Sequence, residues 1–179
     1  LGGLAPASPP GSVPSQPTPV VSSTPPRAPP AKPTRRTTLI PQVAFPVVWA
    51  SHTQRHRAIW EELQFDLKLE HQPNAISVLF RVLLELAVDN YISRIGLAGV
   101  HPNDKLSLKA VKVGEDLLAK GKIDAKYAQI IRKLPNADAI FSIDTLNKYV
   151  HSADFAPSPS HLTALWDQAA TLIVQCLTA

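Results

Sequence analysis

The stretch that decides the fold is PNAISVLFRVLLELAVDNYISRIG, residues 73–96. Its apolar side chains recur at steps of three and four residues, as on one face of an α-helix, and further aliphatic residues widen that face. Pro73 suits the first turn of a helix, where its missing amide hydrogen has no intrahelical partner to lose. A helix that is apolar on most sides is buried among its neighbours. The sequence therefore predicts a central helix from Pro73 to about Gly96.

Shorter periodic stretches predict further helices on both sides of this central one. Residues 55–70 place apolar side chains at near-helical spacing with charged residues between them, which is typical of an amphipathic helix. The other boundaries come from residues that cap or stop helices: Asp104 or Ser107 and Gly121, Asp124 and Pro135, Ser142, and Ser158-Pro159. No segment shows the sustained alternation of a half-buried strand. We therefore predict an all-α fold, a five- to six-helix bundle.

The composition changes near residue 46. Thirteen of the 18 prolines lie in residues 1–46, and five follow. Because proline lacks an amide hydrogen and favours extended backbone, we predict a disordered, proline-rich linker over residues 1–46 and a helical domain over residues 47–179. Pro26-Arg-Ala-Pro29 and Pro30-Ala-Lys-Pro33 match the PxxP pattern that aromatic grooves bind. The alternative is that this spacing arises by chance in so proline-rich a stretch.

The charges divide in a similar way. Residues 1–60 carry six basic residues and no acidic one, whereas residues 61–179 carry 12 basic and 14 acidic residues. The formal net charge of +4 and the isoelectric point of about 9.3 therefore describe the leading segment rather than the helical domain. Arg35-Arg36 could touch a phosphate backbone, but two charges contribute little at physiological salt. Composition thus gives only weak support for RNA or DNA as a partner of the domain.

Cysteine and hydropathy patterns indicate the compartment. The single cysteine, Cys176, rules out an internal disulfide and fits a reducing compartment, so we expect a cytoplasmic protein. No apolar run reaches 18 residues, and the start lacks the features of a signal peptide, so we expect no contact with a membrane. The chain begins at Leu1 rather than Met, which we interpret as the C-terminal piece of a longer polypeptide or a truncated one.

Signals for a cofactor or a metal are weak, and we predict neither. A glycine-rich phosphate loop is absent from the sequence, and one cysteine cannot form a thiolate zinc site. His52 and His56 have metal-ligand spacing, but no third ligand accompanies them. We expect both histidines on the exposed start of the first helix.

Two pairs of polar residues form a candidate cluster. Arg81 and Glu85 are four residues apart on the central helix, and Asn147 and His151 are four apart on the fifth predicted helix. Each pair therefore lies on one helix face. In one interpretation, Arg81 and Glu85 are a solvated ion pair and His151 is a cation near a helix C-terminus. In the other, the amide and the imidazole face the ion pair across the bundle and form a polar pocket.

Several separated motifs carry a resemblance to a known family. They are Thr38-Leu-Ile-Pro41, residues 73–86, Leu146-Asn-Lys-Tyr-Val-His151, Phe155-Ala-Pro-Ser-Pro159 and Trp166-Asp167. Together, over about residues 38–178, they resemble the C-terminal helical domain found on some large prokaryotic ParB-like proteins, a HEPN-like bundle. The resemblance implies an all-helical fold that often dimerises. It implies one of two functions, a metal-independent ribonuclease or a non-catalytic interaction module.

The site residues of the ribonucleases are matched only in part. In those enzymes an arginine precedes a histidine with four to six residues between them, and the two act on the scissile phosphate and the attacking 2′-hydroxyl. Before His151 those positions hold Leu146, Thr145 and Asp144, so the guanidinium that would grip a phosphate is missing there. Arg81 would have to replace it from the neighbouring helix.

Two functional hypotheses follow. The first is a non-catalytic helical module for interaction or dimerisation, tethered by the proline-rich linker, with Trp49 and Trp60 on a dimer face or against a protein partner. The alternative is a HEPN-type endoribonuclease that uses His151 with help from Asn147, Arg81 and Glu85, for which RNA is the partner.

Overall fold

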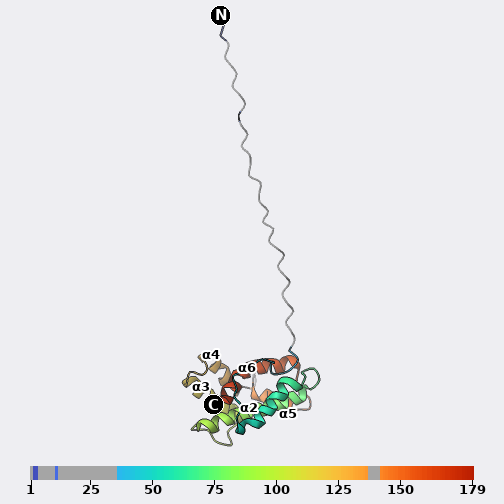
Figure 1. The fold of residues 1–179 in the computed structure, drawn as a ribbon, viewed down its shortest axis with the longest axis vertical. Coiled ribbons are helices and arrows are strands. Elements are labelled where there is room, and N and C mark those ends of the chain that lie inside the picture. Colours follow the sequence, from blue (N-terminus) through green and yellow to red (C-terminus); the bar gives the residue numbers. More distant parts are fainter. Residues whose placement is uncertain (1, 4–10, 12–35, 137–141) are drawn as a thin grey trace. The chain divides into compact units, whose positions relative to one another are not determined.

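The computed structural model describes residues 2–3, 11, 36–136 and 142–179. Contacts divide the chain into two units, Leu1–Thr34 and Arg35–Ala179. Both PxxP segments and most of the predicted linker lie outside the described residues. The second unit holds every helix that the structure describes, and most of these helices are labelled in Figure 1.

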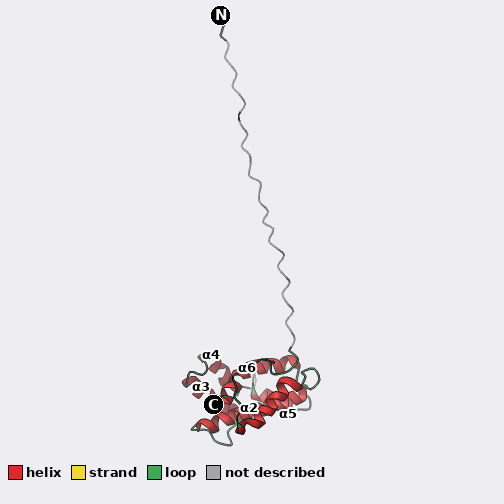
Figure 2. Ribbon diagram, in the orientation of Figure 1, coloured by secondary structure: helices red, strands yellow, loops and turns green. Residues whose placement is uncertain are grey.

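All the regular secondary structure in the described part of the second unit is helical, and this part contains no strand (Figure 2). Its six α-helices are α1 (Gln54–Glu61), α2 (Pro73–Ile95), α3 (Leu106–Ala119), α4 (Ala125–Arg132), α5 (Ile143–His151) and α6 (Pro159–Leu177). A 3₁₀ turn, η1 (Ser51–Thr53), precedes α1, and a π-helical segment, η2 (Glu62–Asp66), follows it. The predicted all-α bundle is confirmed for these residues.

Helix α2 is the centre of the bundle, as the apolar periodicity predicts. It packs most extensively against α6 and α5, and it also contacts α3 and α1 (Figure 1). Phe80, Leu83 and Leu84 are fully buried, and burial of one such side chain stabilises the fold by about 1.5–3 kcal/mol. The helix ends at Gly96, whose positive φ of 63° is a backbone conformation that glycine adopts without strain.

Three of the predicted caps form hydrogen bonds. The side chains of Asp124, Ser142 and Ser158 each accept a bond from the backbone N–H three residues later, at the starts of α4, α5 and α6. Each such cap contributes about 1 kcal/mol. Helix α3 differs, because Lys105 precedes it and no side chain caps it. The Asp104 carboxylate instead accepts from the His101 N–H and from the Lys112 ammonium, so it is engaged outside the helix start.

The first helix is shorter than predicted. We expected it to continue to Glu70, but the helical backbone ends at Asp66 and Leu67 is extended. The extended backbone lets Leu69 turn into the core, where it is almost fully buried. The Leu69 N–H donates to the Thr37 carbonyl at 2.9 Å, so this segment pairs with the chain entering the bundle rather than with its own helix.

The structural unit also begins earlier than the composition indicates. We placed the boundary at residue 46, whereas the unit starts at Arg35. Leu39 and Ile40 are fully buried, and the Ile40 N–H donates to the Leu63 carbonyl at 3.2 Å. Arg36 forms an ion pair with Asp167 of α6 at 2.7 Å. Proline content marks non-helical backbone, but it does not reveal that the buried side chains of Leu39 and Ile40 hold this backbone against the helical core.

Tyr127 ties α4 to α6. Its hydroxyl donates to the Gln168 carbonyl at 2.6 Å and accepts from the Leu172 N–H at 3.0 Å, so it is inserted between two groups of α6 that lie four residues apart. Burial raises the pKa of Tyr127 to about 12. The phenol is therefore a neutral structural group at ordinary pH.

Among the residues that the structure describes, no helix is both long and apolar enough to cross a membrane.

Candidate functional site

Three of the four residues of the candidate polar cluster meet between α2 and α5. The Arg81 Nε donates to the Asn147 Oδ1 at 3.0 Å, and the Arg81 guanidinium forms an ion pair with Glu85 at 2.7 Å. The Arg81 side chain is 19% exposed and that of Glu85 is 46% exposed. The pair therefore sits at the edge of the bundle, where such an interaction contributes up to about 1 kcal/mol.

His151 does not join this group. It occupies the last turn of α5 and is exposed, and its imidazole forms no hydrogen bond or ion pair with any described residue. Asn147, one turn earlier on the same helix, is the residue that reaches Arg81. The structure thus brings Arg81, Glu85 and Asn147 together and leaves His151 at the surface.

The pocket beside Arg81 has mixed charge. It has a volume of about 290 Å³, and its charged lining consists of Arg81, Lys105 and Asp144. Glu85 and Asn147 already occupy two nitrogens of the Arg81 guanidinium. Because the lining carries charges of both signs and the arginine is engaged, this pocket lacks the concentrated positive field that binds a phosphate.

The two histidines with metal-ligand spacing lie in different environments. His52 is exposed as expected, but His56 is buried, which the sequence interpretation missed. The His56 ring faces α2, and its Nε2 is 3.0 Å from the Leu86 carbonyl oxygen. Since a carbonyl only accepts, Nε2 carries the proton and donates it there. Within the described residues, no group of three or more His, Cys, Asp or Glu side chains is placed to hold a metal ion.

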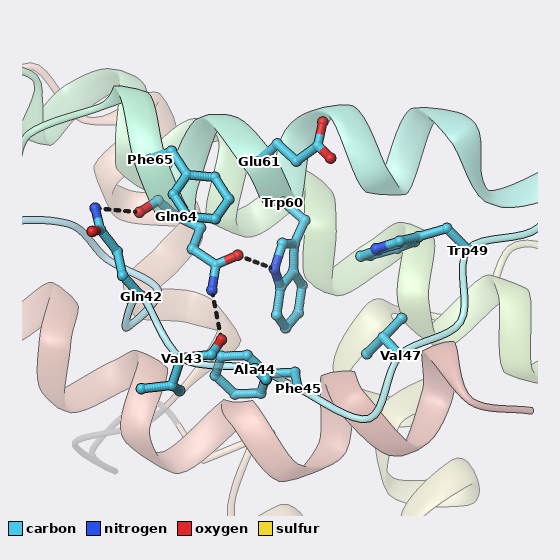
Figure 3. Close-up of a pocket in the computed structure, with 10 residues that line it drawn as sticks. All are labelled: Gln42, Val43, Ala44, Phe45, Val47, Trp49, Trp60, Glu61, Gln64 and Phe65. Carbon is cyan, nitrogen blue, oxygen red and sulfur yellow. Dashed lines mark hydrogen bonds between the residues drawn. The ribbon is translucent and has the colours of Figure 1, made fainter.

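A groove lies between the chain entering the bundle and the first helix (Figure 3). It has a volume of about 390 Å³. We call it the aromatic groove; its lining residues are Gln42, Val43, Ala44, Phe45, Val47, Trp49, Trp60, Glu61, Gln64 and Phe65. One wall comes from the extended residues 42–49 and the other from α1 and η2.

The rings of the aromatic groove pack edge to face. Phe45 and Trp60 have ring centroids 5.0 Å apart at an interplanar angle of 81°, and Trp49 and Trp60 are 5.8 Å apart at 65°. Trp60 also packs against Trp166 of α6, which connects the groove to the core. Pairs of this kind contribute about 0.5–1.5 kcal/mol beyond the area they bury. Trp60 is only 4% exposed, so of the two tryptophans predicted on a dimer face only Trp49 reaches the surface.

A buried amide fixes the shape of the aromatic groove. The Trp60 indole donates to the Gln64 Oε1 at 3.0 Å, and the Gln64 Nε2 donates to the carbonyls of Pro41 and Val43 at 2.7 and 3.1 Å. Figure 3 shows the bonds of Gln64 to Trp60 and to Val43, which cross from the helix to the other wall. Every polar atom of the Gln64 side chain is thereby satisfied. A saturated buried network of this kind holds both walls in one arrangement.

Apolar side chains are exposed along the same groove. Val43 is 59% exposed and Phe65 is 49% exposed, and Val48, between two lining residues, is 85% exposed. The one charged side chain of the lining is Glu61, which forms an ion pair with Arg57 at 2.8 Å through one carboxylate oxygen. The indole nitrogen of Trp49 has no hydrogen-bond partner among the described residues. The groove is therefore mainly apolar, with one charged side chain in its lining.

Sequence reasoning identified the groove only in part. Trp49 and Trp60 were singled out, but residues 42–45 were assigned to the linker and Gln64 was not considered. A signal was present in Phe45-Pro-Val-Val-Trp49, which is apolar throughout and therefore atypical of a solvated linker.

Comparison with known proteins adds no relative. No family model, curated protein or solved structure matches this chain, so the resemblance to HEPN-like domains remains a prediction.

Proposed function

We propose that this chain is a non-catalytic helical interaction module that binds a protein partner or a second copy through the aromatic groove, with the proline-rich segment as its tether. The observation that carries this proposal is a pre-shaped apolar groove with exposed valine and phenylalanine side chains along it. Tryptophan is among the residue types that dominate binding energy at protein interfaces. Clustered exposed apolar side chains are typical of interaction sites.

The network around Gln64 supports the same function. Because both walls are held by satisfied hydrogen bonds, a partner would find the groove already formed. Binding to a formed surface avoids the cost of ordering side chains and backbone. A pre-formed groove therefore supports the proposal that this surface recognises a partner.

The arrangement of polar residues gives less support to the alternative, an endoribonuclease that uses His151. The imidazole has no described neighbour with which to exchange a proton, and Arg81 is engaged by Glu85 and Asn147. The thiol of Cys176, the single cysteine, is fully buried, and burial raises its pKa, which keeps it protonated.

Site-specific photo-cross-linking tests the proposal. A photoreactive residue at Val48, beside the groove, is expected to form discrete protein adducts, either with a second copy in purified protein or with another protein in cells that produce the chain. The same residue at Val78, an exposed position on α2, is the matched control. Adducts should appear from position 48, disappear in Trp49→Ala, and be absent from position 78. Absence of adducts at position 48, or equal adducts from both positions, would overturn the proposal.

Incubation with RNA distinguishes the interaction module from the endoribonuclease. Whole protein incubated with transfer RNA and a metal chelator is expected to leave the RNA intact. Cleavage that yields 2′,3′-cyclic phosphate ends and is lost in His151→Ala would establish the endoribonuclease instead.

A further inference from the structure

We propose that α4 and the turn before it bind the phosphate backbone of a double-helical nucleic acid through lysines that have no partner within the protein. This surface is separate from the aromatic groove, and the inference does not rest on the proposed function. Three features carry it: the distribution of charge, the unpaired lysines and the way in which α4 is held.

Positive charge is concentrated on the hairpin formed by α3 and α4, which lie side by side (Figure 1). Residues 36–179 carry 15 basic and 14 acidic residues, whereas residues 104–133 within them carry eight basic and four acidic residues. The hairpin therefore has a net charge of +4, and the rest of residues 36–179 has a net charge of −3. Composition averaged over the domain conceals this division. A surface on which one sign of charge gathers attracts a polyanion.

Every acidic side chain of the hairpin already has a partner. These partners are Lys112 for Asp104, Arg132 for Glu115, Lys120 for Asp116, and the Tyr127 N–H for Asp124. Of the remaining basic side chains, Lys109 pairs with Asp89 of α2, and Lys105 lines the mixed-charge pocket beside Arg81. The others are exposed and form no hydrogen bond or ion pair with any described residue; they are Lys122, Lys126 and Lys133.

These lysines lie along the outer side of α4. Lys126, Gln129 and Lys133 are exposed and are spaced by three and four residues, so they share one face of this helix. Lys122 is in the turn that leads into α4. We call these four residues the lysine face. Lysine ammonium groups and glutamine amides both donate to phosphate oxygens, and such contacts do not depend on base sequence.

Packing holds α4 in place behind the lysine face. The Arg132 guanidinium donates two hydrogen bonds to the Glu115 carboxylate, at 2.6 and 2.9 Å. Gly114 lets the two helices approach closely, because a Cβ at this position would lie 2.7 Å from the Ile131 Cγ2. The Tyr127 hydroxyl ties α4 to α6. The lysines therefore project from a positioned helix, which lowers the cost of ordering them on binding.

The surroundings of the lysine face favour a duplex over a membrane or a single strand. No large apolar side chain is exposed over residues 109–136, all of which the structure describes, whereas a helix that lies on a membrane inserts an apolar face. Single strands stack their bases on aromatic rings. The one aromatic residue of this segment is Tyr127, and its hydroxyl is inserted into α6. Contact with a phosphate backbone needs neither feature.

Fluorescence anisotropy of the whole protein with labelled DNA and RNA duplexes of about 20 base pairs tests the inference. We expect saturable binding to both, equal affinity for a duplex of scrambled sequence, and a steep loss of affinity with added salt. The triple variant Lys122→Gln, Lys126→Gln and Lys133→Gln should bind about tenfold or more weakly, and its salt slope should be smaller by about two to three.

The matched control removes the same charge from exposed positions outside the hairpin. It is the triple variant Arg55→Gln, Arg94→Gln and Lys148→Gln, which should bind as the unchanged protein does. Circular dichroism confirms that both variants are folded. The inference is overturned if the unchanged protein binds neither duplex, if the lysine-face variant binds equally well, or if the control loses as much affinity.

Two further measurements separate this inference from other functions. Binding to vesicles of phosphatidylcholine and phosphatidylserine through the same lysines, without binding to either duplex, would assign the surface to a membrane and overturn the inference. Cross-linking from Val48 should be the same in the lysine-face variant. Failure of duplex binding therefore leaves the proposed function standing, and absence of adducts from Val48 leaves the lysine face standing.

Discussion

The core around α2 and the aromatic groove are both made of apolar side chains, but those of the core are buried and several of those along the groove are exposed. Around α2, aliphatic and aromatic residues from α5 and α6 close over one another and leave Phe80 and Leu83 fully buried. In the groove, Trp60 is buried in the same way, yet Val43, Val48 and Phe65 remain exposed. The difference shows that the fold is complete without covering the groove. Its exposed apolar side chains form the surface that the proposed partner would cover.

The largest expected effect is a loss of stability in the core around α2. Phe80→Ala removes a fully buried ring that packs against Trp166, at a centroid distance of 6.0 Å, and leaves a cavity. We expect a loss of about 3–5 kcal/mol in the free energy of unfolding. Urea denaturation followed by circular dichroism measures it. An effect below that of a surface substitution would show that α2 is not the centre of the bundle.

The next effect is at the groove floor. Gln64→Leu keeps a side chain of similar size but leaves the Trp60 N–H and the carbonyls of Pro41 and Val43 without their buried partner. The expected cost is about 1–3 kcal/mol, with a change in the near-ultraviolet circular dichroism of the tryptophans. Gln42→Leu, which loses one hydrogen bond of an exposed side chain, is the matched control and should cost less. Equal effects would mean that the network does not hold the groove.

Tyr127, which joins α4 to α6, makes the stability of the helical core depend on pH. Burial raises its pKa from 10 to about 12 in the folded protein, so the folded state holds the phenolic proton more tightly than the unfolded chain does. Its contribution is fully present below pH 10 and is lost as the pH rises from 10 towards 12. Tyr127→Phe should cost about 1 kcal/mol at pH 7 and should unfold with a weaker dependence on pH above 10. Some dependence remains, because burial also raises the pKa of Tyr91 and Cys176.

A smaller effect distinguishes the residues of the candidate polar cluster. Asn147→Ala removes the acceptor of the Arg81 Nε and is expected to destabilise the fold by up to about 1 kcal/mol. His151→Ala changes an exposed side chain without a described partner and should alter stability by less than about 0.5 kcal/mol. Thermal unfolding of both variants side by side measures the difference. A larger loss from His151→Ala would show that this imidazole has a structural role.

The smallest expected effect on stability is at Val48, beside the aromatic groove. Val48 is 85% exposed, so Val48→Asp should change the free energy of unfolding by less than about 0.5 kcal/mol. The introduced carboxylate nevertheless stands beside the groove, and partner binding should weaken. Denaturation and cross-linking from a neighbouring groove position measure the two properties separately. A stability loss comparable to that of Gln64→Leu would mean that this segment is part of the core.

Local features of the fold were predictable because they depend on residues close in the chain. Apolar spacing over residues 73–96 predicts α2, and the caps at Asp124, Ser142 and Ser158 act on N–H groups three residues away. The cap predicted for α3 does not form, because the Asp104 carboxylate bonds the Lys112 ammonium, a competing partner that propensity does not reveal. In the candidate polar cluster, helical spacing places Asn147 and His151 on one face. Helical spacing does not predict which of the two side chains contacts α2, and in the structure Asn147 does so through Arg81.

The sequence by itself determined that this chain is helical, where most of its helices begin and end, and that α2 is buried, since these follow from backbone geometry and the period of apolar residues. Only the tertiary structure decided that residues 36–46 lie against the bundle, that Gln64 joins the two walls, and that Trp60 is covered while Trp49 is not. Those outcomes depend on contacts between residues more than 20 positions apart, such as Gln64 with Pro41 and Arg36 with Asp167. Such contacts are selected by how three-dimensional surfaces fit, which no local pattern encodes.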